Sequence, residues 1–129
     1  MQRNLIAAVA MAAFFVAGAA QAQTRPLPET IAIETTKDLA DTCQVAEGAP
    51  GASEALNFCY GYIIGAGQTY LEMVAAKVIK PIACANPTPN IETIRENFLS
   101  WAAANPQHGG EKALDGLWRS AAAKWPCPK

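Results

Sequence analysis

The chain is 129 residues long, and its ten Lys and Arg residues against eleven Asp and Glu residues give a formal net charge of only −1. This balance does not indicate a nucleic-acid partner, and the sequence contains no basic patch with interleaved aromatic residues. The length suits one small domain. Such a domain buries only about two-thirds of the surface that its unfolded chain exposes, so covalent cross-links contribute strongly to its stability.

Residues 1–22 have the three parts of a secretory signal peptide. A basic tip (MQR) precedes the apolar run LIAAVAMAAFFVAGAA, and Ala20-Gln21-Ala22 supplies a cleavage site of small residues. The apolar run is short for a membrane span of about 20 residues, and no stop-transfer charges follow it. We therefore expect cleavage after Ala22, export to the periplasm, and a mature chain that is not bound to a membrane.

The mature chain is expected to begin with an extended arm over residues 23–34, because this segment has two prolines and no helical period. Thr35 or Thr36 can cap a first helix, in whose first turn Asp38 favours the helix dipole. This helix is expected to end near Cys43.

A second helix is expected after the loop AEGAPGAS (46–53). Ser53 is placed to cap its start. Apolar residues then recur at spacings of three and four, which is the helical period, until about Val78. Pro81 stops the pattern.

Two further helices are expected in the C-terminal half. Asn90 is a good cap for the third helix, which ends before Pro106 because the residue preceding a proline is pushed out of the α region. The loop QHGGE leads to the fourth helix, which Pro126 closes. Trp118 and Trp125 lie on its apolar stripe, and we expect both in the core.

No segment has the length and alternation of a β-strand, so we expect an all-α fold, a small four-helix domain over residues 35–129. The domain contains four cysteines, which are Cys43, Cys59, Cys84 and Cys127. An even count in an exported chain indicates two disulfides. We expect no metal site, because the sequence has no C-x-x-C pair and His108 is its only histidine.

Four cysteines allow three disulfide connectivities. The short loop between the third and fourth helices should make them antiparallel, which places Cys84 at the start of one beside Cys127 at the end of the other. Cys43 and Cys59 flank the loop between the first two helices and can meet if that loop folds back. We therefore expect the pairs Cys43–Cys59 and Cys84–Cys127.

The stretch FCYGYIIGAGQTYLEM (58–73) contains three glycines and belongs to a run without charge between Glu54 and Glu72. It lacks the preceding strand and third glycine of a dinucleotide-binding fingerprint, and the Gly-Lys-Ser/Thr of a P-loop. Gly61 and Gly65 lie one helical turn apart and leave a bare strip, on which another helix backbone can pack closely. Two interpretations remain: packing inside the domain, or the interface of a homodimer.

The sequence contains no group that points to catalysis. Its serines lack a His–Asp arrangement, because His108 is the only histidine. Its carboxylates are spaced as on solvated helix faces and helix starts rather than as acid–base pairs; examples are Glu92, Glu96, Glu111 and Asp115. We therefore expect neither an enzyme activity nor a cofactor.

Several cysteine and glycine motifs resemble the Rap/Tai family, small exported immunity proteins associated with type VI secretion. The motifs are CYGYIIG (59–65), the ending WPCP (125–128), the upstream Cys43, and Cys84 before a proline-rich helix start. The resemblance spans about residues 35–128. It implies an all-α homodimer that binds and inhibits a peptidoglycan amidase toxin in the periplasm. The loop NPQHGGEK is short and rich in glycine, so no toxin-binding residue can be carried over from the family.

A periplasmic stress-related binding or chaperone-like protein is the alternative, since small acid-stress chaperones have a similar size and cysteine usage. A chaperone that opens in acid should carry titrating groups at its dimer interface. The strip around Gly61 and Gly65 is uncharged, which favours the inhibitor.

Overall fold

The structure, a computed structural model, describes residues 33–46 and 48–128. The expected signal peptide (1–22) and all of the expected arm (23–34) except Ile33 and Glu34 lie outside these residues. The described chain confirms the all-α fold, because it contains no strand and consists of four α-helices and a short 3₁₀ helix. The helices are α1 (Thr36–Cys43), α2 (Ala52–Ala75), α3 (Ile91–Ala104), η1 (Pro106–His108) and α4 (Ala113–Lys124).

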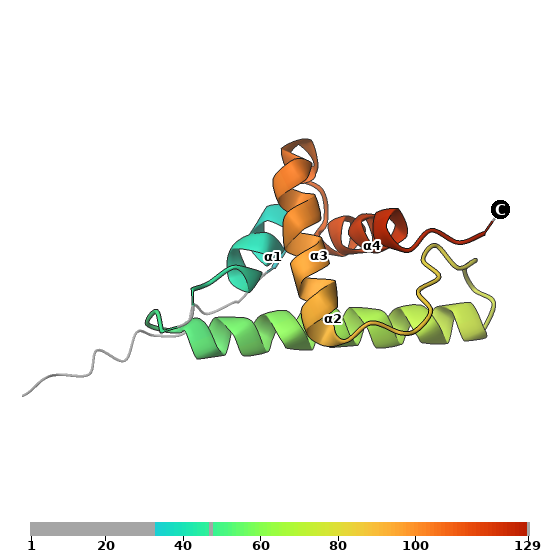
Figure 1. The fold of residues 1–129 in the computed structure, drawn as a ribbon, viewed down its shortest axis with the longest axis horizontal. Coiled ribbons are helices and arrows are strands. Elements are labelled where there is room, and N and C mark those ends of the chain that lie inside the picture. The colour runs from blue at the N-terminus through green and yellow to red at the C-terminus, as the bar shows by residue number, and fades with distance from the viewer. Residues whose placement is uncertain (1–32, 47, 129) are drawn as a thin grey trace, which may run out of the picture. The chain divides into compact units, whose positions relative to one another are not determined.

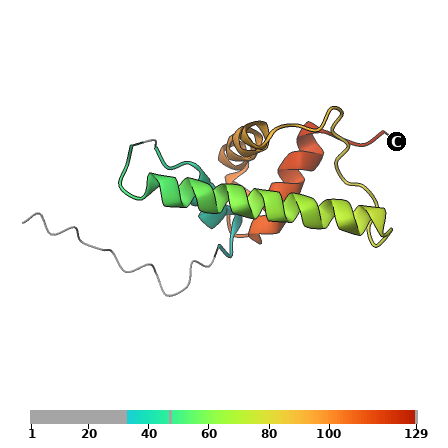
Figure 2. The same ribbon diagram turned by 90° about the horizontal axis from the view of Figure 1, so that it is seen from below.

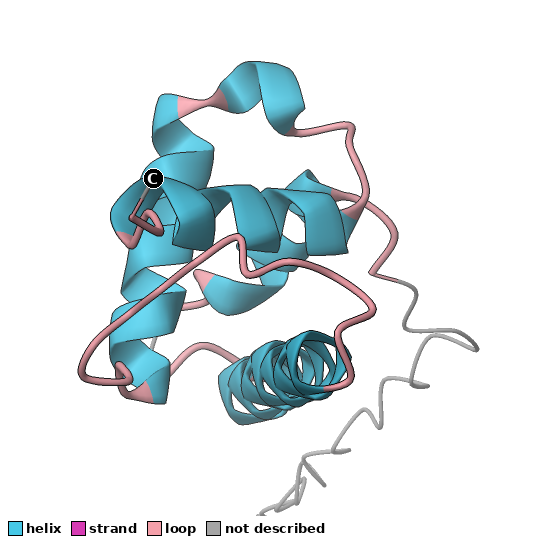
Figure 3. Ribbon diagram, turned by 90° about the vertical axis from the view of Figure 1, so that its right-hand side faces the viewer, coloured by secondary structure: helices cyan, strands magenta, loops and turns pink. Residues whose placement is uncertain are grey.

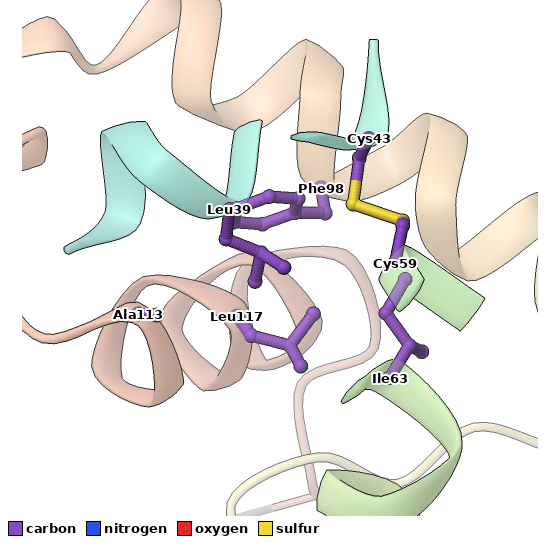
Figure 4. Close-up of a cluster of buried hydrophobic side chains, with 7 residues drawn as sticks. All are labelled: Leu39, Cys43, Cys59, Ile63, Phe98, Ala113 and Leu117. Carbon is purple, nitrogen blue, oxygen red and sulfur yellow. A yellow bond between two sulfur atoms is a disulfide. The ribbon is translucent and has the colours of Figure 1, made fainter. Parts of the chain in front are cut away.

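The helices α1, α3 and α4 lie on the same side of the long helix α2 (Figures 1 and 2). The core forms where the four helices meet, and each of them contributes buried side chains (Figure 4). Its buried hydrophobic residues are Leu39, Cys43, Cys59, Ile63, Phe98, Ala113 and Leu117. Phe98, Leu39 and both cysteines are fully buried, so the first disulfide is part of the core.

Two predicted helix starts are confirmed. Thr35 caps α1: its side chain accepts from the N–H of Asp38, and the Asp38 carboxylate accepts in return from the N–H of Thr35 at 2.9 Å. This reciprocal pair is a capping box. Asn90 caps α3, and its side chain accepts from the N–H of Thr93 at 2.8 Å.

Both predicted ends of α2 are wrong. The helix begins at Ala52 after Gly51, which has a positive φ of 79°, so Ser53 lies within the first turn and does not cap it. The helix ends at Ala75 instead of continuing to Val78, because Lys77 adopts the left-handed conformation with φ of 58°.

Hydrogen bonds explain the early end of α2. The N–H of Val78 donates to the carbonyl of Met73, and the N–H of Lys77 donates to the carbonyl of Val74. These two bonds form a Schellman motif, which closes a helix. Glycine normally occupies the left-handed position, so a lysine there gave no signal in the sequence.

The expected antiparallel arrangement of α3 and α4 is wrong, since the two helices cross steeply (Figures 1 and 2). The connecting segment docks on the start of α1 and turns the chain there. The N–H groups of Thr36 and Lys37 donate to the carbonyls of Glu111 (2.8 Å) and Gly109 (2.9 Å). Thr35 and Lys112 also form an isolated antiparallel bridge.

The structure joins Cys43 to Cys59 and Cys84 to Cys127, with Cα–Cα distances of 5.2 and 4.8 Å. These are the two expected pairs, although the second does not arise from a helical hairpin. Cys84 lies in the segment 76–90, which contains no helix or strand and runs from the end of α2 to α3 (Figure 3). The disulfide therefore fastens this segment to the chain that follows α4.

The close approach between helices occurs at Gly116 of α4, which the sequence analysis missed. A Cβ atom at this position would lie 2.5 Å from Cγ2 of Thr36, and closer still to its Oγ1. Thr36 is buried, and its hydroxyl donates to the carbonyls of Glu111 and Lys112. The missing side chain thus allows α4 to lie directly against the start of α1.

We expect Gly116→Ala to lower the free energy of unfolding by about 1–3 kcal/mol, because overpacking displaces the buried Thr36. Urea unfolding measures this change. Gly67→Ala is the matched control, since a Cβ at this α2 position meets nothing within 4 Å. The control should gain up to about 1 kcal/mol, the helix-propensity difference between glycine and alanine. A stabilising effect of Gly116→Ala would contradict the close approach.

Candidate functional site

Gly61 and Gly65 are exposed on the outer face of α2. A Cβ atom added to either would meet nothing within 4 Å, so in the described chain no helix packs on the strip that they form. The interpretation as packing inside the domain is therefore wrong. The interpretation as a homodimer interface stays a prediction.

Twelve of the 24 residues of α2 are exposed. Its buried residues are Ala52, Cys59 and Ile63, although residues 55–71 carry no charge. Ile64 beside the strip is 48% exposed. An uncharged helix of this kind is normally buried on most sides. No helix in the part of the chain that the structure describes is long and apolar enough to cross a membrane.

A second feature is an apolar cavity of about 240 Å³ between the C-terminal half of α2, the segment 76–90 and the end of α4. Gly67 and Tyr70 line it from α2, and Trp118 and Trp125 line it from the other side. None of the described residues that line it is charged. The cavity therefore suits an uncharged, apolar group.

The wall formed by the segment 76–90 is held on both sides. The hydroxyl of Tyr70 accepts from the N–H of Ala83 at 3.2 Å and donates to the carbonyl of the same residue at 3.0 Å. The N–H of Cys84 donates to the carbonyl of Trp125 at 2.8 Å, and its sulfur is bonded to Cys127. These contacts hold this wall of the cavity in place in the free protein.

The expected core positions of Trp118 and Trp125 are wrong, because both are half-buried and line the cavity. The face of α4 that enters the core carries Ala113, Gly116, Leu117 and Ser120 instead. Three of these residues, Ala113, Gly116 and Ser120, are small, and for that reason the apolar stripe did not include them. The sequence did hold one sign of this core-facing side: Gly116 and Ser120 are four residues apart, which places two small residues on the same face of the helix.

A polar cluster holds the connection between α3 and α4. Nδ1 of His108 lies 2.7 Å from one carboxylate oxygen of Glu111, and Nε of Arg119 lies 2.9 Å from the other. The contact with Arg119 is an ion pair. The ring of His108 also stacks on Trp101, with centroids 5.5 Å apart. Glu111 is therefore part of the fold rather than a solvated carboxylate.

The hydrogen bond from His108 is the main cause that lowers the pKa of Glu111 below its usual value of 4.5, and the charge of Arg119 lowers it further. The hydrogen bonds of the capping box likewise lower the pKa of Asp38. A carboxylate with a lowered pKa stabilises the fold fully above its unfolded pKa, and this stabilisation is lost as the pH falls through the folded pKa. Both groups therefore favour the folded state at neutral pH and not in strong acid.

We expect Glu111→Gln to lose less stability than the wild type between about pH 6 and pH 3. The amide is neutral at both pH values, so the stabilisation by the ionised carboxylate, which acid removes, is absent from this variant. Urea unfolding at the two pH values measures the effect. Glu96→Gln is the control, since Glu96 is exposed on α3 and forms no ion pair among the described residues. An identical acid loss in Glu111→Gln and Glu96→Gln would contradict the role of Glu111.

The described residues offer no cluster of three or more metal-ligating side chains. A sequence model of the Rap1a immunity proteins matches residues 35–127, which is most of the chain. The chain belongs to the Rap1a immunity protein family. This confirms the family that the motifs suggested. No curated protein and no solved structure matches the chain.

Members of an immunity protein family act by binding a toxin, so in a Rap1a protein the functional site is a binding surface. The described structure leaves two apolar features open to a partner, which are the glycine strip on the outer face of α2 and the apolar cavity. The sequence predicted the strip as a helix-packing or dimer surface, left the toxin-binding residues unknown, and gave no sign of the cavity.

Proposed function

We propose that this Rap1a protein is a periplasmic immunity protein that binds and inhibits a peptidoglycan amidase toxin delivered by type VI secretion. The family match over residues 35–127 is the observation that carries the proposal. An inhibitor of this kind needs a stable binding surface and no catalytic group. The resemblance to the Rap/Tai family supports an amidase as the target.

A periplasmic site of action is supported by two features. Residues 1–22 have the sequence pattern of a cleaved signal peptide. Both disulfides of the domain require an oxidising compartment to form and persist. Peptidoglycan lies in the same compartment, so the toxin and its inhibitor would meet there.

A homodimer through the strip of Gly61 and Gly65 is the second part of the proposal. The strip is open, and it lies on the part of α2 that carries no charge. Half of the residues of this helix are exposed. Two α2 helices could approach backbone to backbone at these glycines, as helices with small residues at this spacing do.

We expect light scattering of the protein at micromolar concentration to give about twice the mass of the mature chain. Gly65→Leu should give a monomer, because a branched side chain would separate the two backbones. Gly110→Leu, in the loop before α4, is the control, since that position is also open and lies on another element. A monomeric wild-type protein would contradict the proposed interface.

Protection of cells tests the function. Bacteria that receive a type VI amidase effector in the periplasm should lyse, and co-expression of the full chain should prevent lysis. A variant lacking residues 1–22 should give no protection. Equal protection without these residues would contradict a periplasmic site of action. Suppression of general protein aggregation without protection from the amidase would favour the chaperone-like alternative.

A further inference from the structure

We infer that the apolar cavity between α2, the segment 76–90 and α4 receives one large apolar side chain, aromatic or leucine, that projects from the toxin. The inference rests on the proposed function, because the guest belongs to the toxin. It assigns a toxin-contacting surface that the sequence left unknown.

The volume of the cavity fits a single side chain. Sites for drug-sized ligands have volumes of about 300–1,000 Å³, whereas this cavity holds about 240 Å³. Protein interfaces commonly depend on a few large anchor side chains that enter pockets of the partner. The size therefore favours a protein anchor over a free metabolite.

The lining determines the chemistry of the guest. The indole rings of Trp118 and Trp125 and the ring of Tyr70 offer aromatic surface, and no described lining residue is charged. Leu71 and Ile82 also line the cavity, and they are 62% and 39% exposed. Binding that covers these two side chains removes apolar surface from water. This favours an uncharged anchor side chain with apolar toxin surface around it.

The cavity is already formed in the free protein. The bonds of Tyr70 to the segment 76–90 and the disulfide Cys84–Cys127 fix its outer wall. Binding therefore does not have to order this segment, and a smaller part of the interaction free energy is lost to entropy.

The charges beside the cavity indicate what surrounds the anchor. Lys77 and Lys80 precede the lining residue Ile82, and Lys124 precedes the lining residue Trp125. The exposed carboxylate Glu72 follows the lining residue Leu71, so the three lysines outnumber it. All three lysines are exposed, and none forms an ion pair within the described chain. A toxin surface with carboxylates around an apolar anchor would complement them, and added salt should then slow its association.

The cavity and the glycine strip lie on different faces of α2. Gly67 and Leu71 line the cavity, and they lie about a third of a turn around the helix from Gly61 and Gly65. A dimer that forms at the strip therefore leaves the cavity open to the toxin.

Gly67→Leu tests the inference directly. A Cβ at Gly67 meets nothing within 4 Å, so the new side chain can enter the cavity without displacing the helix. Inhibition of the amidase should weaken by about 30-fold or more, the effect of losing an anchor contact. The melting temperature should rise rather than fall, because leucine is the better helix former. Gly67→Ala fills less of the cavity and should cause a smaller loss.

Ser100→Leu is the matched control, because it adds the same side chain at an exposed position of α3 that does not line the cavity. Its inhibition should equal that of the wild type. Toluene, which has the ring of a phenylalanine side chain, probes the cavity without a toxin. Titration of the protein purified from the periplasm should give saturable NMR shifts at Gly67, Ala83 and Trp118, and Gly67→Leu should abolish them.

Four results would overturn the inference, and they separate its failure from that of the proposed function. Undiminished inhibition by Gly67→Leu would reject the cavity and leave the immunity role intact. Dissociation of the dimer by Gly67→Leu, with inhibition retained, would identify a second copy as the guest. Uptake of toluene by a protein that inhibits no amidase would reject the toxin as the guest together with the proposed function. Absence of saturable shifts with toluene would reject the cavity as a site for apolar groups.

Discussion

We expect Phe98→Ala to lower the free energy of unfolding by about 3–5 kcal/mol, the usual cost of removing a buried phenylalanine ring. Phe98 is fully buried in the core between the four helices (Figure 4). Its ring fills space that Leu39 and Leu117 cannot fill without moving, so a cavity remains after truncation. Urea unfolding followed by circular dichroism measures the change.

Phe58→Ala is the control for this substitution, because Phe58 lies on α2 and is only partly buried. It removes the same atoms and should cost much less. Equal effects of the two substitutions would show that Phe98 is not at the centre of the core.

We also expect a large loss of stability when the disulfide Cys43–Cys59 is removed. We expect Cys43→Ala/Cys59→Ala to lower stability by at least about 3 kcal/mol. The chain-entropy model gives about this value for the sequence separation of 16 residues between the two cysteines. Both cysteines are also fully buried, so lost packing adds to the cost.

The double variant Cys84→Ala/Cys127→Ala provides the comparison. It opens a longer loop, with a sequence separation of 43 residues, and the same model gives about 4 kcal/mol. Cys84 is exposed, so we expect no added loss from the core, and the effects should be large and similar. The second variant should also release the segment 76–90 and abolish toluene binding. A cost below about 1 kcal/mol for Cys43→Ala/Cys59→Ala would contradict a disulfide in the core.

The local features of the fold could be predicted because neighbouring residues determine them. The side chains of Thr35 and Asn90 cap their helices by accepting hydrogen bonds from N–H groups three residues later in the chain. The ends of α2 depend on left-handed backbone at Gly51 and Lys77, and only one of these is a glycine. A lysine in that conformation depends on its surroundings, and a pattern of apolar residues does not reveal it.

The relations between distant segments were harder to predict. The pairs Cys43–Cys59 and Cys84–Cys127 were expected, but the second was argued from antiparallel helices that instead cross steeply. Bonds from the start of α1 to residues 109 and 111 set that crossing, and no local pattern marks them. The cavity was missed because an apolar stripe on α4 does not tell whether it faces the core or an open space.

Gly61 and Gly65 illustrate the limit of an argument from spacing. Small residues one turn apart show that a helix can be approached closely, but not by which partner. In the described structure the internal approach occurs at Gly116, while Gly61 and Gly65 face outward. The same spacing therefore leaves α2 open for a second chain.

Titration of a purified type VI amidase effector with the protein purified from the periplasm tests the central claim most directly. Release of soluble fragments from peptidoglycan is the readout. The proposed function predicts that hydrolysis falls linearly and stops at about one inhibitor chain per amidase, the behaviour of a tight-binding inhibitor. Hydrolysis that continues undiminished in a large molar excess of the protein, for every amidase effector tested, would contradict it.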